Sequence, residues 1–323
     1  MLNKILICGL GSIGSKYLQL LLNDWPHLQI AAFRSGLYET NIRNSGLIQF
    51  SKLDNALDWS PDAAIISNPA PYHLKYALAL AREKIPLLIE KPLGCSYQPS
   101  SKWDELTNIS KTIKILVGYQ FRHDSVAKFL KSSLDQKLIG RLVQADFYCG
   151  SWLPEWRAQS DYRDTVSARK SLGGGALLEL SHEIDLANWL LNPLEIQYIL
   201  NSQSGLLEID VEDQSCLIGK AGNGVMTTIR LDFCTSPPSR YSIFRGSKGE
   251  LKWDLIKRCL YLSSEGGDQK VIYTASELDN CYREQIAHFF DCIQKDMQPL
   301  CSLQDGLDVL KIIANGTQSK DVG

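Results

Sequence analysis

The six residues Gly9-Leu10-Gly11-Ser12-Ile13-Gly14 constrain the fold more than any other part of the sequence. An apolar run over residues 5–8 precedes them, and leucines at positions 18, 21 and 22 follow at helical spacing. A strand that turns through GxGxxG into a helix is typical of a dinucleotide-binding βαβ unit, in which the helix N-terminus faces the phosphates. We therefore expect a cofactor to contact Gly9, Gly11, Ser12, Ile13 and Gly14.

Apolar strands and amphipathic helices alternate over the first 120 residues, which predicts a parallel, doubly wound sheet. Further strands are expected at 28–33, 48–50, 63–67, 86–93 and 114–120, with helices at 53–57, 72–84 and 103–110. Beyond about residue 140, strand-like segments separated by glycine turns predict antiparallel hairpins instead. Two late helices follow at 281–296 and 303–316, the second ending in a C-cap at Asn315-Gly316. The predicted fold class is α/β, with a dinucleotide-binding domain over 1–120 and a second, α+β domain over 121–323. The last helices could pack back on the first domain.

The second strand ends at Arg34-Ser35, about twenty residues past the glycine loop. An acidic residue at this position would bind the ribose 2′-hydroxyl of NAD, whereas an arginine and a hydroxyl can hold a 2′-phosphate. The sequence therefore favours NADP(H) as cofactor. NAD(H) stays open, because Arg34 could be a solvated residue of a chain that accepts both.

Other polar residues follow the remaining strands, and the carboxyl ends of parallel strands meet at one edge of a sheet. Asn68-Pro69 and Glu90-Lys91 lie at such ends and are expected near the cofactor. Lys91 is the most informative, because a lysine at a buried strand end needs a partner or a function. His73 follows the Asn68-Pro69 turn and could touch the cofactor or be structural.

Composition excludes several classes of protein. The formal net charge of −2 gives no reason to expect nucleic acid or an anionic membrane as partner, and no apolar run is long enough to span a membrane. Nine cysteines occur without a CxxC pair, and the N-terminus lacks a signal-peptide pattern. We therefore expect a cytoplasmic protein with free thiols, no structural disulfide and no metal cluster.

Residues 173–190, GGGALLELSHEIDLANWL, predict one helix after three glycines. Glu179, His182 and Asp185 would then lie within an arc of about 120° of its surface. Histidine suits proton transfer near neutral pH because its unperturbed pKa is about 6.5, and a carboxylate beside it could fix its tautomer. Two alternatives are a metal site, which a lone histidine disfavours, and an ordinary solvated face.

These motifs, in their order and spacing, resemble the Gfo/Idh/MocA oxidoreductases over nearly the whole chain. The segments concerned are GLGSIG, AAIISNPAPYHLKYALALAREKIPLLIEKPLG, VGYQFRHDSVAKFLK and the stretch after the triple glycine. The resemblance implies a Rossmann domain followed by a domain with a large, mostly antiparallel open sheet, through which members associate as homodimers or homotetramers. It also implies that Lys91 contacts nicotinamide and substrate, and that His182 is the acid/base across the crevice. The usual acid is an aspartate four residues before the histidine, so Glu179, three residues before it, departs from the pattern.

A long segment before the glycines, residues 151–175, is rich in tryptophan, tyrosine and basic residues. Such side chains can pack against sugar rings and clamp phosphates or carboxylates, although a solvated loop is the alternative. The segment resembles a subgroup associated with bacterial surface-sugar pathways. This resemblance implies a sugar-derived substrate, such as a nucleotide sugar or another anionic sugar. The candidate substrate residues are Arg122, Trp156, Arg157, Tyr162, Arg163, Lys170 and His182.

The leading hypothesis is an NAD(P)-dependent oxidoreductase that transfers a hydride between nicotinamide and a sugar alcohol or ketone. Lys91 and His182 would carry the charge and proton work, with Glu179 and Asp185 as supporting carboxylates. The alternatives are a dinucleotide-binding regulator of the same fold and a Rossmann-type methyltransferase.

Overall fold

The computed structural model describes residues 2–34, 47–157, 160–222, 224–264, 266–275 and 279–317. Contacts within the chain divide it into two compact units. The first unit contains Met1–Gly94, Gln98–Gly118 and Tyr282–Gly306, and the second contains Cys95–Tyr97, Tyr119–Cys281 and Leu307–Gly323.

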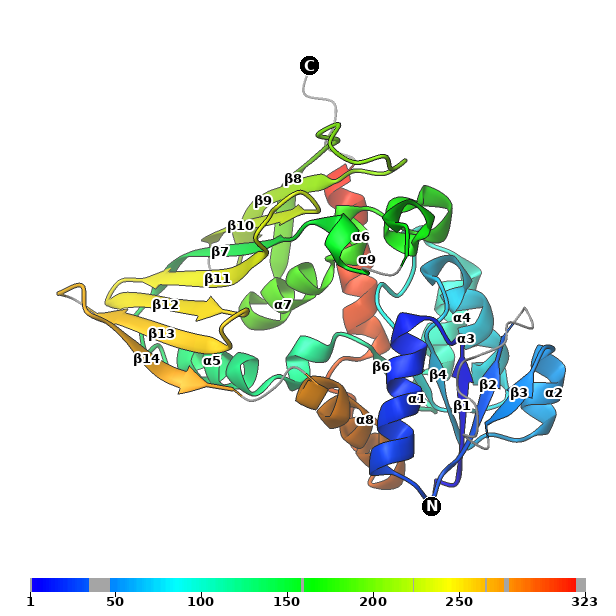
Figure 1. Ribbon diagram of the computed structural model, residues 1–323. Coiled ribbons are helices and arrows are strands. Elements are labelled where there is room, and N and C mark those ends of the chain that lie inside the picture. The colour runs from blue at the N-terminus through cyan, green and yellow to red at the C-terminus, as the bar shows by residue number, and fades with distance from the viewer. Residues whose placement is uncertain are drawn as a thin grey trace. The chain divides into compact units, whose positions relative to one another are not determined.

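A parallel sheet forms the first unit, with strand order β3-β2-β1-β4-β5-β6 (Figure 1). Its strands are nearly continuous apolar runs, as expected for strands covered on both faces. They are β1 (Lys4–Cys8), β2 (Gln29–Phe33), β3 (Ile48–Phe50), β4 (Ala63–Ile66), β5 (Leu87–Ile89) and β6 (Ile115–Val117). The helices between them are α1 (Ser12–Asp24), α2 (Leu53–Asp58), η1 (Ala70–Tyr72), α3 (His73–Arg82) and α4 (Ser101–Ile109). The predicted parallel, doubly wound sheet is thereby confirmed.

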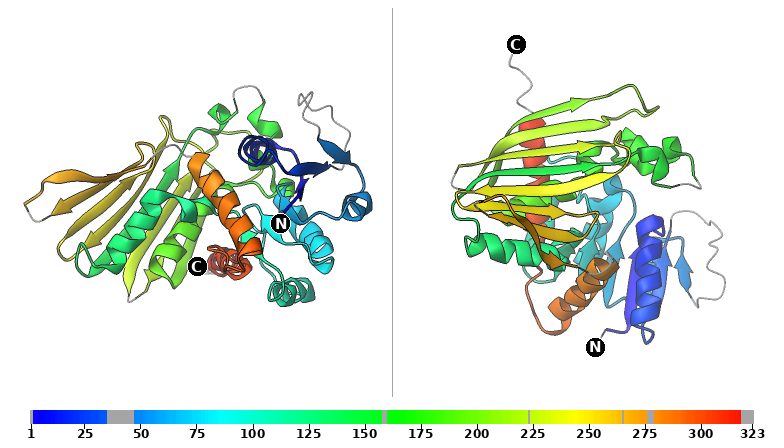
Figure 2. Two further views of the ribbon diagram at one scale, coloured as in Figure 1. Left: turned by 90° about the horizontal axis from the view of Figure 1, so that it is seen from below. Right: turned by 60° about the vertical axis from the view of Figure 1, so that its left-hand side comes forward.

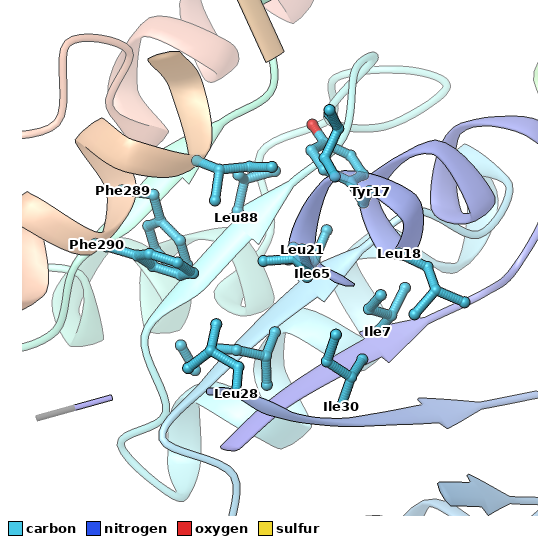
Figure 3. Packing of buried hydrophobic residues seen from close by; sticks show 14 of the residues in the cluster. Ile7, Tyr17, Leu18, Leu21, Leu28, Ile30, Ile65, Leu88, Phe289 and Phe290 are labelled. Carbon is cyan, nitrogen blue, oxygen red and sulfur yellow. The ribbon is translucent and has the colours of Figure 1, made fainter. Parts of the chain in front are cut away.

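The main apolar core of this unit joins residues that are far apart in the sequence (Figure 3). Leu18 and Leu21 of α1 pack over Ile7 and Ile65 of the sheet. The late helix α8 (Asp279–Gln294) adds Phe289 and Phe290 to the same cluster. Each large buried side chain contributes about 1.5–3 kcal/mol of hydrophobic free energy, so this cluster holds α1 and its glycine loop in place.

An eight-stranded sheet forms the second unit, with order β14-β13-β12-β11-β7-β10-β9-β8 (Figures 1 and 2). All neighbouring strands are antiparallel except β7 and β10, so the predicted mostly antiparallel sheet is confirmed. The strands are β7 (Leu142–Gly150), β8 (Leu194–Ser202), β9 (Gln214–Ala221), β10 (Val225–Asp232), β11 (Ser239–Gly246), β12 (Gly249–Asp254), β13 (Cys259–Ser264) and β14 (Gln269–Thr274).

Alternation along these strands separates two faces. Phe147, Phe244 and Trp253 point to one face and are fully buried. Helices α5 (Ser125–Asp135) and α7 (His182–Leu191) cover this face (Figures 1 and 2). The opposite face carries exposed apolar side chains, among them Met226 of β10.

Two predicted helix features are wrong. The helix expected over 173–190 is two helices, α6 (Ala176–Glu179) and α7, because Leu180 departs from helical geometry with φ −98° and ψ 17°. The C-cap expected at Asn315-Gly316 is absent, since α9 (Leu303–Thr317) continues through both residues. A Cβ on Gly316 would lie 2.3 Å from Cγ1 of Ile199, so the glycine allows close packing rather than a turn. Among the described helices, none has the length and apolar character needed to cross a membrane.

Candidate functional site

The glycine loop has the geometry that a bound pyrophosphate requires. Gly9 has φ +95°, and a Cβ on Gly14 would lie 2.1 Å from the carbonyl oxygen of Gly9. A Cβ on Gly11, in contrast, would meet no described atom within 4 Å. Within the described part of the chain, no side chain caps the N-terminus of α1 and no acidic residue lies in its first turn. The backbone N–H groups there, including those of Ser12 and Ile13, suit the phosphates of a dinucleotide.

Arg34 directly follows β2, next to the glycine loop's strand in the sheet. Its backbone N–H donates to the carbonyl oxygen of Phe50 at 3.0 Å, and its side chain is half-buried. Ser35, the second residue expected to read the ribose, lies outside the described residues.

His73 is placed differently from a cofactor ligand. Its ring is only 2% exposed, with Nδ1 3.0 Å from the Pro92 carbonyl oxygen and Nε2 2.6 Å from that of Asn68. Burial, and to a smaller degree the charge of Lys91, lowers the pKa of His73 to about 4. Both ring nitrogens therefore face the main chain, and His73 links the turn after β4 to the turn after β5. The neighbouring Asn68 Oδ1 is buried without a hydrogen-bond partner in the described residues, so this amide keeps an acceptor available.

Glu90 anchors the segment that carries Lys91. The buried Glu90 carboxylate accepts a hydrogen bond from Tyr17 Oη at 2.5 Å and another from the Lys91 backbone N–H at 3.1 Å. A Cβ on Gly118, the residue after β6, would lie 2.9 Å from Oε1 of Glu90, so a glycine here leaves room for the carboxylate. Both of these hydrogen bonds come from protein groups and hold the turn after β5 in place, and the cofactor contact expected of Glu90 stays a prediction. Sequence reasoning missed Tyr17 because it resembles any apolar residue of α1.

His182 begins α7 in the second unit, and it is buried beside a carboxylate that sequence reasoning overlooked. Its Nε2 lies 3.6 Å from Oε1 of Glu183, and its ring packs against Phe121 with centroids 5.5 Å apart. Glu183 is completely buried, and its Oε1 accepts a hydrogen bond from Arg240 Nε at 2.7 Å and forms an ion pair with Arg240 Nη2 at 2.5 Å. Burial raises the pKa of Glu183, and Arg240 opposes that rise. Adjacent helix residues do not normally face each other, which is why sequence reasoning missed this pair.

Asp185 and Arg122, expected as a supporting carboxylate and a substrate residue, form a buried ion pair. Arg122 is 2% exposed and Asp185 is 1% exposed. The guanidinium donates to the carboxylate through Nη2 at 2.6 Å and Nε at 3.0 Å, a bidentate geometry. This buried pair ties the turn η2 (Gln120–His123) to α7, which gives both residues a structural role. The roles expected of them in catalysis and substrate binding stay predictions.

Glu179 ends α6, so it does not share a helix face with His182. Its Oε2 accepts a hydrogen bond from Ser167 Oγ at 3.1 Å. The preceding glycines let this segment pack tightly: a Cβ on Gly174 would lie 2.4 Å from the Val166 carbonyl oxygen, and Gly175 has φ +106°. The expected alignment of three polar residues on one helix was wrong because it assumed no break.

Several side chains of the segment before the glycines, residues 151–172, form contacts with other protein groups. Arg163 pairs with Asp161 at 2.7 Å and with Glu208 at 3.1 Å. The Tyr162 hydroxyl accepts from the Glu208 backbone N–H, and Trp156 Nε1 donates to Ser151. The side chains of Arg157 and Lys170 are exposed, so these two remain the candidates in this segment for contact with an anionic substrate.

Cys149 of β7 lies beside His182 and Glu183. Each of the three residues offers one donor atom, these atoms lie within 4.8 Å of one another, and all three side chains are buried. The expectation that no metal-ligating cluster exists rested on spacing along the sequence, which does not show a ligand supplied by another element.

Comparison with known proteins gives two matches that together cover most of the chain. Residues 3–119 match the model of an oxidoreductase family's NAD-binding Rossmann fold. Residues 131–323 match the model of the C-terminal alpha/beta domain of the same family.

Individual relatives are distant in sequence. Inositol 2-dehydrogenase 2 of Saccharopolyspora erythraea is 25% identical over 184 residues, which cover 56% of this chain and 50% of the relative. The chain spans about half the length of the first curated relatives it matches. Two solved structures share the fold at 18% identity. The structure of levoglucosan dehydrogenase with NADH aligns with a TM-score of 0.83, and the alignment covers 98% of this chain and 96% of that protein. The WlbA dehydrogenase of Bordetella pertussis with NADH and UDP-GlcNAcA has a TM-score of 0.78 and covers 99% and 97%.

Proposed function

Since the chain belongs to the Gfo/Idh/MocA oxidoreductase family, we propose that it is a nicotinamide-dependent dehydrogenase or reductase acting on the CH–OH group of a sugar derivative. The observation that carries the proposal is the environment of His182. Its buried imidazole lies beside the Glu183 carboxylate, which in turn pairs with Arg240. A histidine in this setting can accept and return a proton, which is what oxidation of an alcohol requires from a protein group.

The residues present fit a bound dinucleotide. The uncapped N-terminus of α1 would hold the pyrophosphate, with the open space at Gly11 admitting its oxygens. Asn68 and Lys91, at the ends of β4 and β5, would contact the nicotinamide half. When bound, the nicotinamide supplies the hydride chemistry itself.

The chain's own residues perform the proton and charge work. In the oxidative direction the neutral imidazole of His182 takes the hydroxyl proton, and the neighbouring Glu183 carboxylate stabilises the imidazolium that forms. The Lys91 ammonium stabilises the alkoxide as it develops. Tyr17 holds the Glu90 carboxylate, and Glu90 in turn holds the Lys91 backbone N–H. These contacts position the Lys91 ammonium before the substrate arrives.

We also propose a preferred cofactor and a charge for the substrate. Arg34 after β2 supports NADP(H) over NAD(H), because a guanidinium favours a 2′-phosphate. The exposed Arg157 and Lys170 support an anionic substrate such as a nucleotide sugar. WlbA, which shares the fold, has been solved with NADH and the nucleotide sugar UDP-GlcNAcA, whereas levoglucosan dehydrogenase has been solved with NADH and levoglucosan.

The test is a screen of purified protein with NADP or NAD and a panel of sugars and nucleotide sugars, following reduced nicotinamide by absorbance. With a substrate found, we expect Lys91→Met and His182→Asn to lower kcat by about 10²–10⁴-fold, the usual contribution of a proton-transfer group. Both variants should still be stabilised by the preferred dinucleotide in thermal melts, since a ligand that prefers the native state raises Tm. Full turnover in Lys91→Met would contradict the mechanism. Equal stabilisation by NADH and NADPH would remove the role assigned to Arg34.

A further inference from the structure

Cys149, His182 and Glu183 come from two elements of the second unit, strand β7 and the first turn of α7. One donor atom from each lies within 4.8 Å of the other two, and all three side chains are buried. A thiol, an imidazole and a carboxylate are the three ligand types that zinc prefers.

The distances are close to those of a coordinated ion. Zinc binds these ligand types at about 2.0–2.3 Å, so two ligands of a tetrahedral ion are about 3.3–3.8 Å apart. His182 Nε2 and Glu183 Oε1 are already separated by 3.6 Å. Binding therefore needs the thiol and these two groups to approach by at most about 1.5 Å, which a side-chain rotation can supply.

A second observation indicates a missing partner at this place. Glu183 is fully buried, and its Oε2 has no hydrogen-bond partner among the residues that the structure describes. A buried carboxylate oxygen normally has a donor or a cation beside it, because leaving it unsatisfied costs free energy.

We propose that Cys149, His182 and Glu183 form a binding site for Zn²⁺ and similar divalent transition metals. Binding converts the Cys149 thiol to a metal-bound thiolate and releases its proton to solvent. A water molecule completes the coordination, as in sites with three protein ligands. Arg240 pairs with Oε1 of Glu183 and places a positive charge beside the site, so it weakens the affinity of the site for a cation. Replacement by an uncharged residue such as Met should tighten metal binding.

The site would also inhibit the reaction, a consequence that rests on the proposed function. A ring nitrogen of His182 that is bound to the ion cannot exchange a proton with substrate. The site is therefore inhibitory, and metal binding and turnover exclude each other.

Cobalt(II) substitution tests the site without any measurement of activity. We expect the metal-stripped protein to bind one Co²⁺ with a thiolate-to-cobalt charge-transfer band in the near ultraviolet. Cys149→Ser should remove this band and weaken binding by more than about tenfold, the range seen even for less direct changes at metal sites. The matched control is Cys292→Ser, because the Cys292 thiol also lies beside a histidine, 3.4 Å from His288 Nε2. This control should keep the band.

Wild-type protein supplies a second measurement in case Cys149→Ser folds poorly. Zn²⁺ should slow alkylation of Cys149 by a small maleimide under mildly destabilising conditions, as quantified by peptide mass spectrometry. Absence of the band, its persistence in Cys149→Ser, or its loss in Cys292→Ser would overturn the site. A band that depends on Cys149 together with unimpaired turnover would leave the site standing and contradict the role of His182 instead.

Discussion

Gly11 and Gly14 are three residues apart, yet their surroundings differ completely. A Cβ on Gly14 would lie 2.1 Å from a backbone oxygen, whereas one on Gly11 would meet nothing described within 4 Å. Gly14 therefore belongs to the packing of α1 on β1, whereas Gly11 borders the open space in which we propose that the dinucleotide phosphates bind. The same motif thus combines a structural requirement with a functional one, and the two can be separated by experiment.

Alanine at each position should separate them. Gly14→Ala should lower the free energy of unfolding by about 1–3 kcal/mol or more, the usual cost of overpacking. Gly11→Ala should leave unfolding by urea nearly unchanged, because its φ of −70° suits any residue. It should weaken binding of the dinucleotide, measured by calorimetry, by about tenfold for each 1.4 kcal/mol of lost phosphate contact. Unchanged affinity in Gly11→Ala would show that the phosphates bind elsewhere.

His73 predicts a pH dependence of stability. Its pKa in the folded protein is about 4, below the ordinary value of 6.5, so the unfolded chain binds a proton more readily. The stability it contributes is present above pH 6.5 and is lost as pH falls from 6.5 towards 4. The loss amounts to about 3 kcal/mol, from about 1.36 kcal/mol per unit of pKa. His73→Gln should flatten this part of the curve of unfolding free energy against pH. An equally steep curve in the variant would assign the dependence to other groups.

At the scale of elements, the buried pair of Arg122 and Asp185 connects η2 to α7, the helix that begins with His182. Its geometry is bidentate and nearly free of solvent, so each charge depends on the other. Such a pair need not add much net stability, but the removal of either residue alone is strongly destabilising, because it leaves the other charge buried without its partner.

A double-mutant cycle checks this connection. Arg122→Met and Asp185→Leu should each destabilise the protein by about 3–5 kcal/mol, because each leaves an uncompensated buried charge. The double variant should recover much of that loss in urea unfolding. If Arg122→Met instead kept full stability and raised only KM, the original assignment of Arg122 to substrate binding would be restored.

At the scale of the molecule, the eight-stranded sheet leaves one face exposed. Tyr198 of β8 is paired with Ile218 of β9 on that face. Met226 of β10 lies on the same face, two residues along β10 from the residue that pairs with Ile218. They are 55%, 43% and 54% exposed, respectively. Contiguous exposed apolar side chains mark interaction surfaces in soluble proteins. We therefore propose that two copies associate through this face, as the family resemblance implies.

Light scattering tests the association. Wild-type protein should be a dimer or a tetramer, and Ile218→Asp with Met226→Glu should yield a smaller species with an unchanged circular dichroism spectrum. Val143→Asp is the matched control, because Val143 is 52% exposed but belongs to the opposite face of β7. A wild-type monomer, or an oligomer insensitive to the double substitution, would contradict the proposal.

Local patterns were sufficient to predict the sheet of the first unit and its glycine loop, and they indicated Lys91 and His182 as candidate catalytic residues. Each depends on contacts within a few residues: an apolar run, a turn that needs glycine, or a helix period. The environment of His182 could not be predicted in this way. Cys149, Arg240 and Glu183 come together only because β7, β11 and α7 pack in one unit, and the break at Leu180 rotates α7 away from the expected face.

The sequence by itself thus determined the kind of sheet and the candidates for the reactive side chains, since periodicity and glycine spacing are properties of neighbouring residues. Only the tertiary structure decided what those side chains face. Asp185 turned out to pair with Arg122, Glu90 with Tyr17 and Glu183 with Arg240. The partners in each pair lie more than fifty residues apart in the chain. Burial determines the physical outcome, because a charge removed from water must take whichever partner the packing brings to it.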